Sequence, residues 1–286
     1  MDVRGSEDAG WTATATGGSA RLRRVLAMSE LGRGACLVTA AGCAGFVDAV
    51  AGGGGLIQLP ALFLFLSPAE AAGVATVLGT NKLSSICGTG MAVAQYTRRV
   101  RLNWASLLPA AVTALAFSFL GARTVSVIQS DVLKPLVFGL LVAVAVYTLV
   151  RKDFGDRHAP QFSARRERWL GALVGAGIGF YDGFFGPGTG SFLIFIFIGW
   201  FGFDFLAASA SAKVINFATN LAAVAYFAAS GHILYRFAVP MALGNALGGI
   251  AGARLAILKG NRFVRVCFLA VAAVLIVRFG WDVWRR

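Results

Sequence analysis

Two lysines interrupt long apolar segments of the chain, and their positions are the strongest indication of chemistry. Lys82 lies at the middle of the apolar segment 68–96, and Lys213 lies within the segment 205–231. A charge at the centre of a membrane segment costs about 2.5–3.5 kcal/mol on insertion scales, so it indicates a functional site. A lysine offers a point charge and three donors, which suits an anion with several oxygens, such as a sulfonate. Hydroxyl and amide side chains flank both lysines and are expected to line the same site: Thr80, Asn81 and Ser84 in the first segment and Asn216 in the second.

Two aspartates in apolar surroundings, Asp48 and Asp182, open an alternative reading of the lysines. Each lysine could pair with a nearby acid and merely neutralise it. The aspartates themselves have three candidate roles. They could accept backbone N–H groups as a local cap, form an ion pair with a lysine, or titrate and couple the site to protons.

A glycine-rich stretch follows each aspartate, at 45–55 and at 179–190. A break in a membrane helix exposes backbone polar groups and is tolerated only where protein or a water-filled cavity covers it. Two equivalent breaks are typical of binding sites in membrane transporters, where the N–H groups of half-helices face anions. The groups expected to hold oxygens belong to Gly53, Gly54, Gly55, Gly188, Thr189 and Gly190, with Gln58 as a further lining residue.

The composition places these residues in a membrane protein. Of 286 residues, 57% are hydrophobic and 14% are charged, whereas soluble domains carry about 25% charged residues. Apolar runs of spanning length recur along the chain, which predicts an all-α polytopic protein in a lipid bilayer. The net charge of +13 comes mostly from loops, so it indicates membrane orientation rather than nucleic-acid binding. Unpaired cysteines and two loop histidines predict no metal site and no cofactor.

The chain is predicted to contain an internal duplication. Lys213 follows Lys82 by 131 positions (213 − 82), and Pro240 follows Pro109 by the same distance. Five apolar segments precede a basic loop and five follow it. The predicted units are a disordered cytoplasmic tail at 1–32, a first repeat at 33–150, a basic cytoplasmic linker at 151–168 and a second repeat at 169–286.

Glycines at four-residue spacing predict close packing between helices. Small residues at this spacing let two helix backbones approach each other in lipid. The two series are Gly171, Gly175 and Gly179 in one segment and Gly244, Gly248 and Gly252 in another.

The number of crossings was tested with the distribution of basic residues. If each glycine-broken pair, 34–66 and 169–201, crosses once as an interrupted unit, one side holds 18 Lys and Arg residues and the other holds 6. If the pieces cross separately or the pairs are re-entrant, the split is 11 to 13. The first arrangement predicts about eight crossings, four per repeat, with both termini in the cytoplasm.

With these features in view, the chain resembles the sulfite exporter TauE/SafE family, also called the toluene sulfonate uptake permease family. The resemblance covers about residues 34–284. It rests on Gly45 to Gly55 with Pro60, on Gly79-Thr80-Asn81, and on Gly179 to Gly190 with Gly231. It implies transport of sulfite, thiosulfate, sulfoacetate, sulfonates or related organic acids. Pro187 and Thr189 depart from the pure glycine run of the first copy, so the two halves are not expected to contribute equally.

These observations favour a secondary transporter in the inner (plasma) membrane, coupled to an ion or proton gradient and working by alternating access. No phosphate-binding loop for ATP is visible. A membrane enzyme is disfavoured because clustered acids and membrane histidines are missing from the sequence. A non-transporting accessory or scaffold protein is the alternative. The expected partners are a small anion and lipid, with a homo-oligomer left open.

Overall fold

The computed structural model describes residues 29–67, 69–70, 73–125 and 162–284. Across these residues the secondary structure is helical throughout, as predicted, and no strand occurs in them. The predicted segment 132–150 lies outside the described residues. The helices are α2 (Glu30–Ala51), α3 (Gly55–Phe65), α4 (Val74–Tyr96), α5 (Trp104–Val125), α7 (Ala164–Phe184), α8 (Thr189–Gly199), α9 (Phe205–Ala229) and α10 (Tyr235–Trp284).

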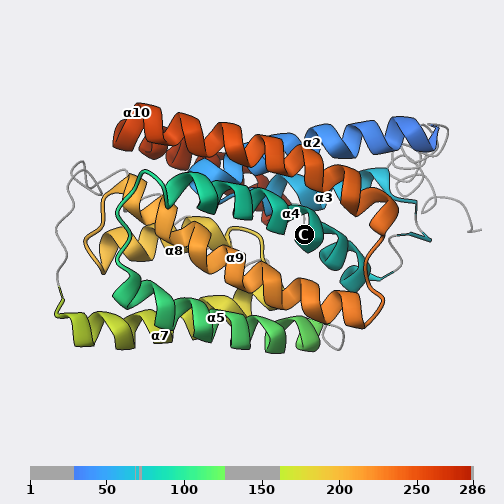
Figure 1. The fold of residues 1–286 in the computed structure, drawn as a ribbon. Helices are drawn as coiled ribbons and strands as arrows, with labels where there is room; N and C mark the ends of the chain where they lie inside the picture. Colours follow the sequence, from blue (N-terminus) through green and yellow to red (C-terminus); the bar gives the residue numbers. More distant parts are fainter. Residues whose placement is uncertain (1–28, 68, 71–72, 126–161, 285–286) are drawn as a thin grey trace, which may run out of the picture.

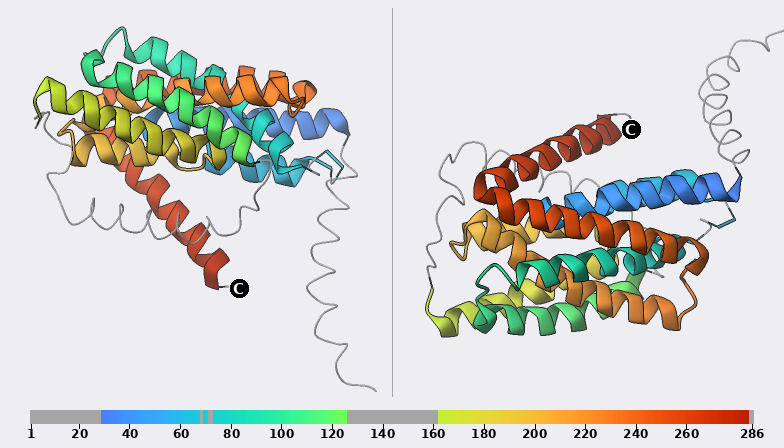
Figure 2. Two further views of the ribbon diagram at one scale, coloured as in Figure 1. Left: turned by 90° about the horizontal axis from the view of Figure 1, so that it is seen from below. Right: turned by 45° about the horizontal axis from the view of Figure 1, so that its top comes forward.

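Four helical stretches within the described residues are long and apolar enough to cross a membrane: α2, α5, α9 and 235–271 of α10. The helices run roughly along one direction, with α2 and α10 on one side, α4 and α9 in the middle, and α5 and α7 on the other (Figure 1). Gly260 interrupts α10 with a φ of 67°, and the part after it leaves the main layers (Figure 2). The arrangement encloses the middle of α4 and α9, where the two lysines lie.

Two helices begin earlier than the sequence predicted. Ser29 caps α2 by accepting a hydrogen bond from the N–H of Gly32, so the helix includes the last residues assigned to the tail. Similarly, α7 begins at Ala164, inside the stretch 151–168 assigned to the linker. Glu167 lies in its first turn, where a carboxylate is favoured by the helix dipole, and accepts a hydrogen bond from the side chain of Asn103.

The first glycine-broken pair doubles back on itself. A single interrupted helix would place Arg33 and Phe65 roughly 48 Å apart at 1.5 Å per residue. Instead, the Arg33 guanidinium donates to the carbonyl of Phe65 at 3.4 Å and to Glu70 at 2.9 Å. Gly54 lies against the backbone of Ala44, so the chain reverses directly after α2 and α3 runs back along it.

The second pair reverses in the same way. The ring of Phe162, just before α7, lies 6.3 Å from the ring of Phe201, just after α8. Both reversals use glycines in the left-handed region: Gly52 has a φ of 79°, and Gly186 and Gly188 have φ values of 88° and 84°. The prediction that each pair crosses once as an interrupted unit was therefore wrong, and the count of eight crossings that rested on it loses its support.

The two glycine series form close helix contacts, as predicted. Gly171, Gly175 and Gly179 of α7 lie against Ser106, Ala110 and Ala114 of α5. Gly244, Gly248 and Gly252 of α10 lie against Val38, Gly42 and Phe46 of α2. Residue numbers rise together in both contacts, so each helix pair is parallel, and each pair joins one half of the chain to the other.

The two halves enter the bundle from opposite ends. At one end, the start of α2 meets the start of α10 through ion pairs of Glu70 with Arg33 and with Arg236. At the other end, the start of α7 meets the start of α5 through Glu167 and Asn103. Because α2 and α7 are the first helices of the two halves, the halves run in opposite directions.

Glu70, in the turn between α3 and α4, holds the first of these ends together. Burial alone would raise the pKa of its carboxyl, but hydrogen bonds from Ser67 and the Arg33 guanidinium outweigh burial and hold this pKa below its usual value. Arg236 pairs with Glu30 as well, at 3.3 Å. The Glu70 cluster thus ties the start of α2, the turn after α3 and the start of α10 to one another.

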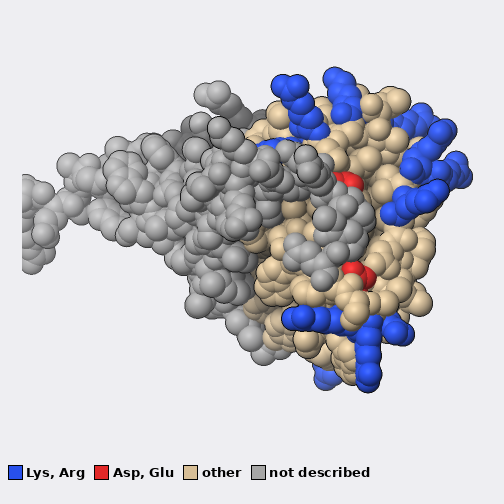
Figure 3. Space-filling view, turned by 90° about the vertical axis from the view of Figure 1, so that its left-hand side faces the viewer, with Lys and Arg blue, Asp and Glu red and all other residues tan. Residues whose placement is uncertain are grey.

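Basic residues gather at the opposite end (Figure 3). The hydrogen bonds of Asn103 with Glu167 and of Leu206 with Asn261 place the turns before α5, α7 and α9 beside the break at Gly260. The exposed basic residues there are Arg98, Arg99, Arg101, Arg165, Arg166, Arg168, Lys259 and Arg262. The arrangement with 18 basic residues on one side had placed 98–101 on that side and 254–265 on the other, whereas here they lie at the same end. With doubled-back pairs the whole-chain charge count becomes 11 against 13, which no longer assigns the termini to the cytoplasm.

Candidate functional site

The two helix breaks meet at a small polar cavity in the middle of the bundle. Its volume of about 30 Å³ is room for a few water-sized groups, since one water needs about 10–15 Å³. Both halves contribute to its wall. The lining residues are Asp48, Gly52, Gly55, Asn81, Lys82, Ser85, Asp182, Gly186, Gly188, Thr189, Gly190, Asn216 and Asn220.

Lys82 forms an ion pair with Asp182 at the wall of this cavity. The Lys82 Nζ lies 2.6 Å from Oδ2 of Asp182, and both residues are about 95% buried. The second oxygen of Asp182 accepts a hydrogen bond of 2.7 Å from the Thr189 hydroxyl. Gly186 lies beside the ammonium, because a Cβ added there would be 3.4 Å from Nζ. The carboxylate therefore bridges α4 and the start of α8.

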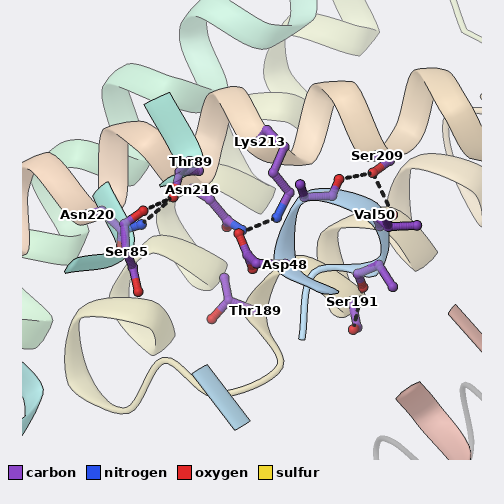
Figure 4. Close-up of polar contacts among 12 residues, drawn as sticks. Asp48, Val50, Ser85, Thr89, Thr189, Ser191, Ser209, Lys213, Asn216 and Asn220 are labelled. Carbon is purple, nitrogen blue, oxygen red and sulfur yellow. Dashed lines mark hydrogen bonds and ion pairs between the residues drawn. The ribbon is translucent and has the colours of Figure 1, made fainter. Parts of the chain in front are cut away.

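Lys213 forms the second ion pair, with Asp48. Its Nζ lies 2.9 Å from Oδ2 of Asp48, and Figure 4 shows the lysine of α9 pointing to the carboxylate at the end of α2. The Lys213 side chain is fully buried, whereas that of Asp48 is 21% exposed. Asp48 lines the cavity and Lys213 does not, so the lysine lies behind its own partner.

Both ion pairs connect opposite halves of the chain. Lys82 of the first half meets Asp182 of the second, and Lys213 of the second meets Asp48 of the first. Of the three roles considered for the aspartates, the ion pair is the one whose contact the structure contains. A buried pair that loses one partner leaves an uncompensated charge, which typically costs about 3–5 kcal/mol.

Hydroxyl groups satisfy the backbone carbonyls at the end of α2. The Tyr96 hydroxyl donates to the carbonyl of Ala49 at 2.9 Å, and that of Ser209 donates to Val50 at 2.8 Å. The Ser191 hydroxyl donates to the carbonyl of Ala51 at 2.8 Å; Figure 4 includes Ser209 and Ser191. These bonds explain how the break is tolerated inside an apolar bundle, because exposed carbonyls there would be costly.

The second break presents a backbone donor to the cavity at Gly190. In the described part of the chain, no hydrogen-bond acceptor is found for the N–H groups of Gly190 and Ser191 in the first turn of α8. A helix N-terminus attracts anions through such groups and its dipole. Gly190 also lies against Gly52, so both breaks touch here.

Several predicted site residues lie elsewhere and have structural contacts. Gly53 and Gly54 accept hydrogen bonds from the first turn of α3, and of the three predicted glycines there only Gly55 lines the cavity. Thr80 accepts a hydrogen bond from the N–H of Leu234. Gln58 donates to the carbonyl of Asn81 and accepts from the side chain of Asn245. Ser84 is buried one residue away from the lining Ser85.

Four lining residues were missed from the sequence: Gly52, Ser85, Gly186 and Asn220. The repeat offset could have identified two of them. Asn216 follows Ser85 by 131 positions (216 − 85), and Asn220 donates a hydrogen bond of 3.2 Å to Thr89, its counterpart at the same offset. Figure 4 shows these polar groups along α4 and α9.

Two side-chain amides have unused hydrogen-bonding capacity at this cavity. Asn81 and Asn216 are about 95% buried, and the oxygen of each lacks a partner within the described residues. A carboxamide offers donors on one side and an acceptor on the other, so rotation about the last bond can present either to a ligand.

No cluster of three His, Cys, Asp or Glu side chains suited to a metal ion occurs among the residues described.

Comparisons with known proteins agree on one family. The profile described as "Sulfite exporter TauE/SafE" matches residues 37–279. A probable membrane transporter protein ORF9 of Sinorhizobium sp. is 37% identical over 85% of this chain and 91% of its own. A probable membrane transporter protein of Haemophilus influenzae is 34% identical over 84% and 91%. The probable membrane transporter protein YfcA of Escherichia coli K12 is 33% identical over 84% and 86%. No solved structure matches the chain.

Proposed function

The chain belongs to the sulfite exporter TauE/SafE family of membrane proteins, and we propose that it is a secondary transporter of small sulfur-containing anions. The class includes sulfite, thiosulfate, sulfoacetate and sulfonates. Relatives named as membrane transporters favour this activity over an enzymatic one. We place the protein in the plasma membrane as a multi-pass protein.

One observation carries the proposal: a polar cavity lined by the buried Lys82 lies where two broken helices meet, with Lys213 behind the Asp48 carboxylate. Gly190, whose N–H group has no acceptor among the described residues, lines the same cavity as Lys82. An anion there would gain a cation, a helix N-terminus and amide donors together. Broken helices whose N-termini point at an anion near the bilayer midplane are typical of secondary transporters.

The opposite directions of the two halves support alternating access. We propose that 33–150 and 169–286 are inverted repeats, and that the second repeat extends back to the start of α7 at Ala164. Each would contain a doubled-back pair followed by three crossings, and an odd number of crossings inverts the second repeat. The exchange of partners between the halves, through Lys82–Asp182 and Lys213–Asp48, supports a site at their interface. Rocking one repeat against the other would open this interface to each side in turn.

Coupling to an ion or proton gradient completes the proposal. The two aspartates are the groups that could carry a proton, because each lies at a break and contacts a lysine. The anion itself supplies a negative charge to an already balanced site, so an accompanying cation would reduce the cost of burying it.

Flux into proteoliposomes tests this function. Purified protein would be reconstituted and offered labelled sulfite, thiosulfate, sulfoacetate and acetate, with and without an imposed pH gradient. We expect saturable flux of at least one sulfur anion, absent from empty liposomes and abolished by Lys82→Ala. Failure of every anion to enter, in protein that is monodisperse and thermally stable, would refute transport and favour an accessory or scaffold role.

A further inference from the structure

We propose that Asp182 is an internal competitor for the transported anion at Lys82, whereas Lys213 and Asp48 form a pair that stays closed. In the empty site the carboxylate of Asp182 occupies the place of a substrate oxygen. An arriving anion displaces it from the ammonium. This inference rests on the proposed function and assigns different roles to two pairs that the sequence presents as equivalents.

The positions of the two lysines distinguish the pairs. Both Lys82 and Asp182 line the cavity, so an anion in the cavity can reach the ammonium directly. Lys213 does not line it and its side chain is fully buried behind Asp48. An anion could reach Lys213 only after removing the carboxylate that stands between them.

Asp182 has a second partner that can hold it after displacement. Its Oδ1 accepts the Thr189 hydroxyl at 2.7 Å, while its Oδ2 contacts Lys82 at 2.6 Å. Losing the lysine therefore leaves the carboxylate hydrogen-bonded at the start of α8, which lowers the cost of displacement. The Asp48 carboxylate contacts Lys213 and, within the described residues, accepts no hydrogen bond from a hydroxyl group.

The surroundings of Lys82 can replace Asp182 with an external oxyanion. Gly186 leaves the space beside Nζ free of a side chain. The N–H group of Gly190 has no acceptor among the described residues, and the amides of Asn81 and Asn216 have unused capacity. A compact oxyanion could accept from the ammonium and from these donors at once.

Internal competition makes a quantitative prediction for Asp182→Asn. A ligand that binds only when its site is open is weakened by the fraction of time that the site is open. If Asp182 leaves Lys82 free about one-tenth of the time, its removal tightens binding about tenfold. The same change should reduce maximal flux, because the returning carboxylate helps to release the anion.

Equilibrium binding of labelled sulfite, measured at one fixed pH for all variants, tests the proposal. We expect about tenfold tighter binding and slower maximal flux for Asp182→Asn. The matched variant Asp48→Asn should give no tighter binding than wild type. Unchanged or weaker binding by Asp182→Asn, or equal tightening by both variants, would overturn the proposal.

Two double variants keep the test valid if a single variant does not fold. Lys82→Gln/Asp182→Asn and Lys213→Gln/Asp48→Asn each replace an ion pair by a neutral hydrogen-bonding pair of similar shape. The first should lose saturable sulfite binding and the second should retain it. The reverse result would overturn the assignment of roles.

If wild type binds and transports none of the anions, the proposed function fails and this inference fails with it. If wild type transports an anion but the variants do not show the expected differences in binding, this inference alone is rejected.

Discussion

Replacing Gly179 by alanine should weaken the contact between α7 and α5 and disturb the site. A Cβ at Gly179 would lie 2.6 Å from both the Cα and the carbonyl oxygen of Ala114. These are backbone atoms and cannot rotate away, so the helices must separate by roughly 0.8 Å to reach an ordinary contact of about 3.4 Å. Overpacking of this kind costs about 1–3 kcal/mol.

Gly177 provides the matched control in the same helix. It is exposed, and a Cβ there would meet no atom within 4 Å. Both substitutions gain about 1 kcal/mol of helix propensity, so the difference between the variants isolates the contact and should be about 1–3 kcal/mol. Because Asp182 lies three residues beyond Gly179, we also expect lower anion flux for Gly179→Ala alone.

Thermal unfolding of the purified variants in detergent, followed by flux in proteoliposomes, measures both effects. We expect Gly177→Ala to melt at or above the wild-type temperature and Gly179→Ala to melt below it. Equal melting temperatures for the two variants would refute the close parallel packing of α7 on α5.

Three further predictions concern the contacts that hold the bundle and its breaks. The pKa of Glu70 is lowered in the folded protein, so the stability that Glu70 contributes is present above its unfolded pKa and is lost as pH falls through its folded pKa. The melting temperature of the wild type should therefore drop in acid by more than that of Glu70→Gln, and equal drops in the two proteins would contradict this. Tyr96→Phe leaves the Ala49 carbonyl with only the longer contact to the Ser209 hydroxyl, at 3.2 Å, and should cost about 0.5–1.5 kcal/mol, measured by chemical unfolding; a neutral effect would show that Ser209 satisfies this carbonyl by itself. Lys213→Met should lower the free energy of unfolding by about 3–5 kcal/mol because Asp48 is left unpaired, and the double variant Lys213→Met/Asp48→Leu should recover most of this loss. A double variant no more stable than Lys213→Met would argue against a closed pair.

The chemical content of the site was largely readable from the sequence. Lys82, Asp182 and Thr189 stood out because polar groups within apolar segments are costly and seldom accidental. The glycine series also gave correct helix contacts, since small residues at four-residue spacing leave one face of a helix open to another backbone. Asn81 and Asn216, chosen for their closeness to the lysines, line the cavity, and their role in binding substrate stays a prediction.

The path of the chain through the breaks could not be read in this way. Glycines indicate that a helix stops, but the direction after the break depends on the left-handed conformations at Gly52 and Gly188 and on the contact of Gly54 with Ala44. The charge count then selected the wrong arrangement, because it assumed that each broken pair crosses once. The identity of each lysine's partner depended on the same point, since only halves that run in opposite directions bring Lys82 to Asp182.

The central claim, that this cavity is the anion site, is tested most directly by an experimental structure of the protein with bound sulfite. We expect density for the anion within hydrogen-bonding distance of the Lys82 ammonium and the N–H group of Gly190. Asp182 should have left Lys82 while keeping its contact with Thr189, and the Lys213–Asp48 pair should be intact. Sulfite bound elsewhere, with Lys82 and Asp182 still paired, would contradict the account.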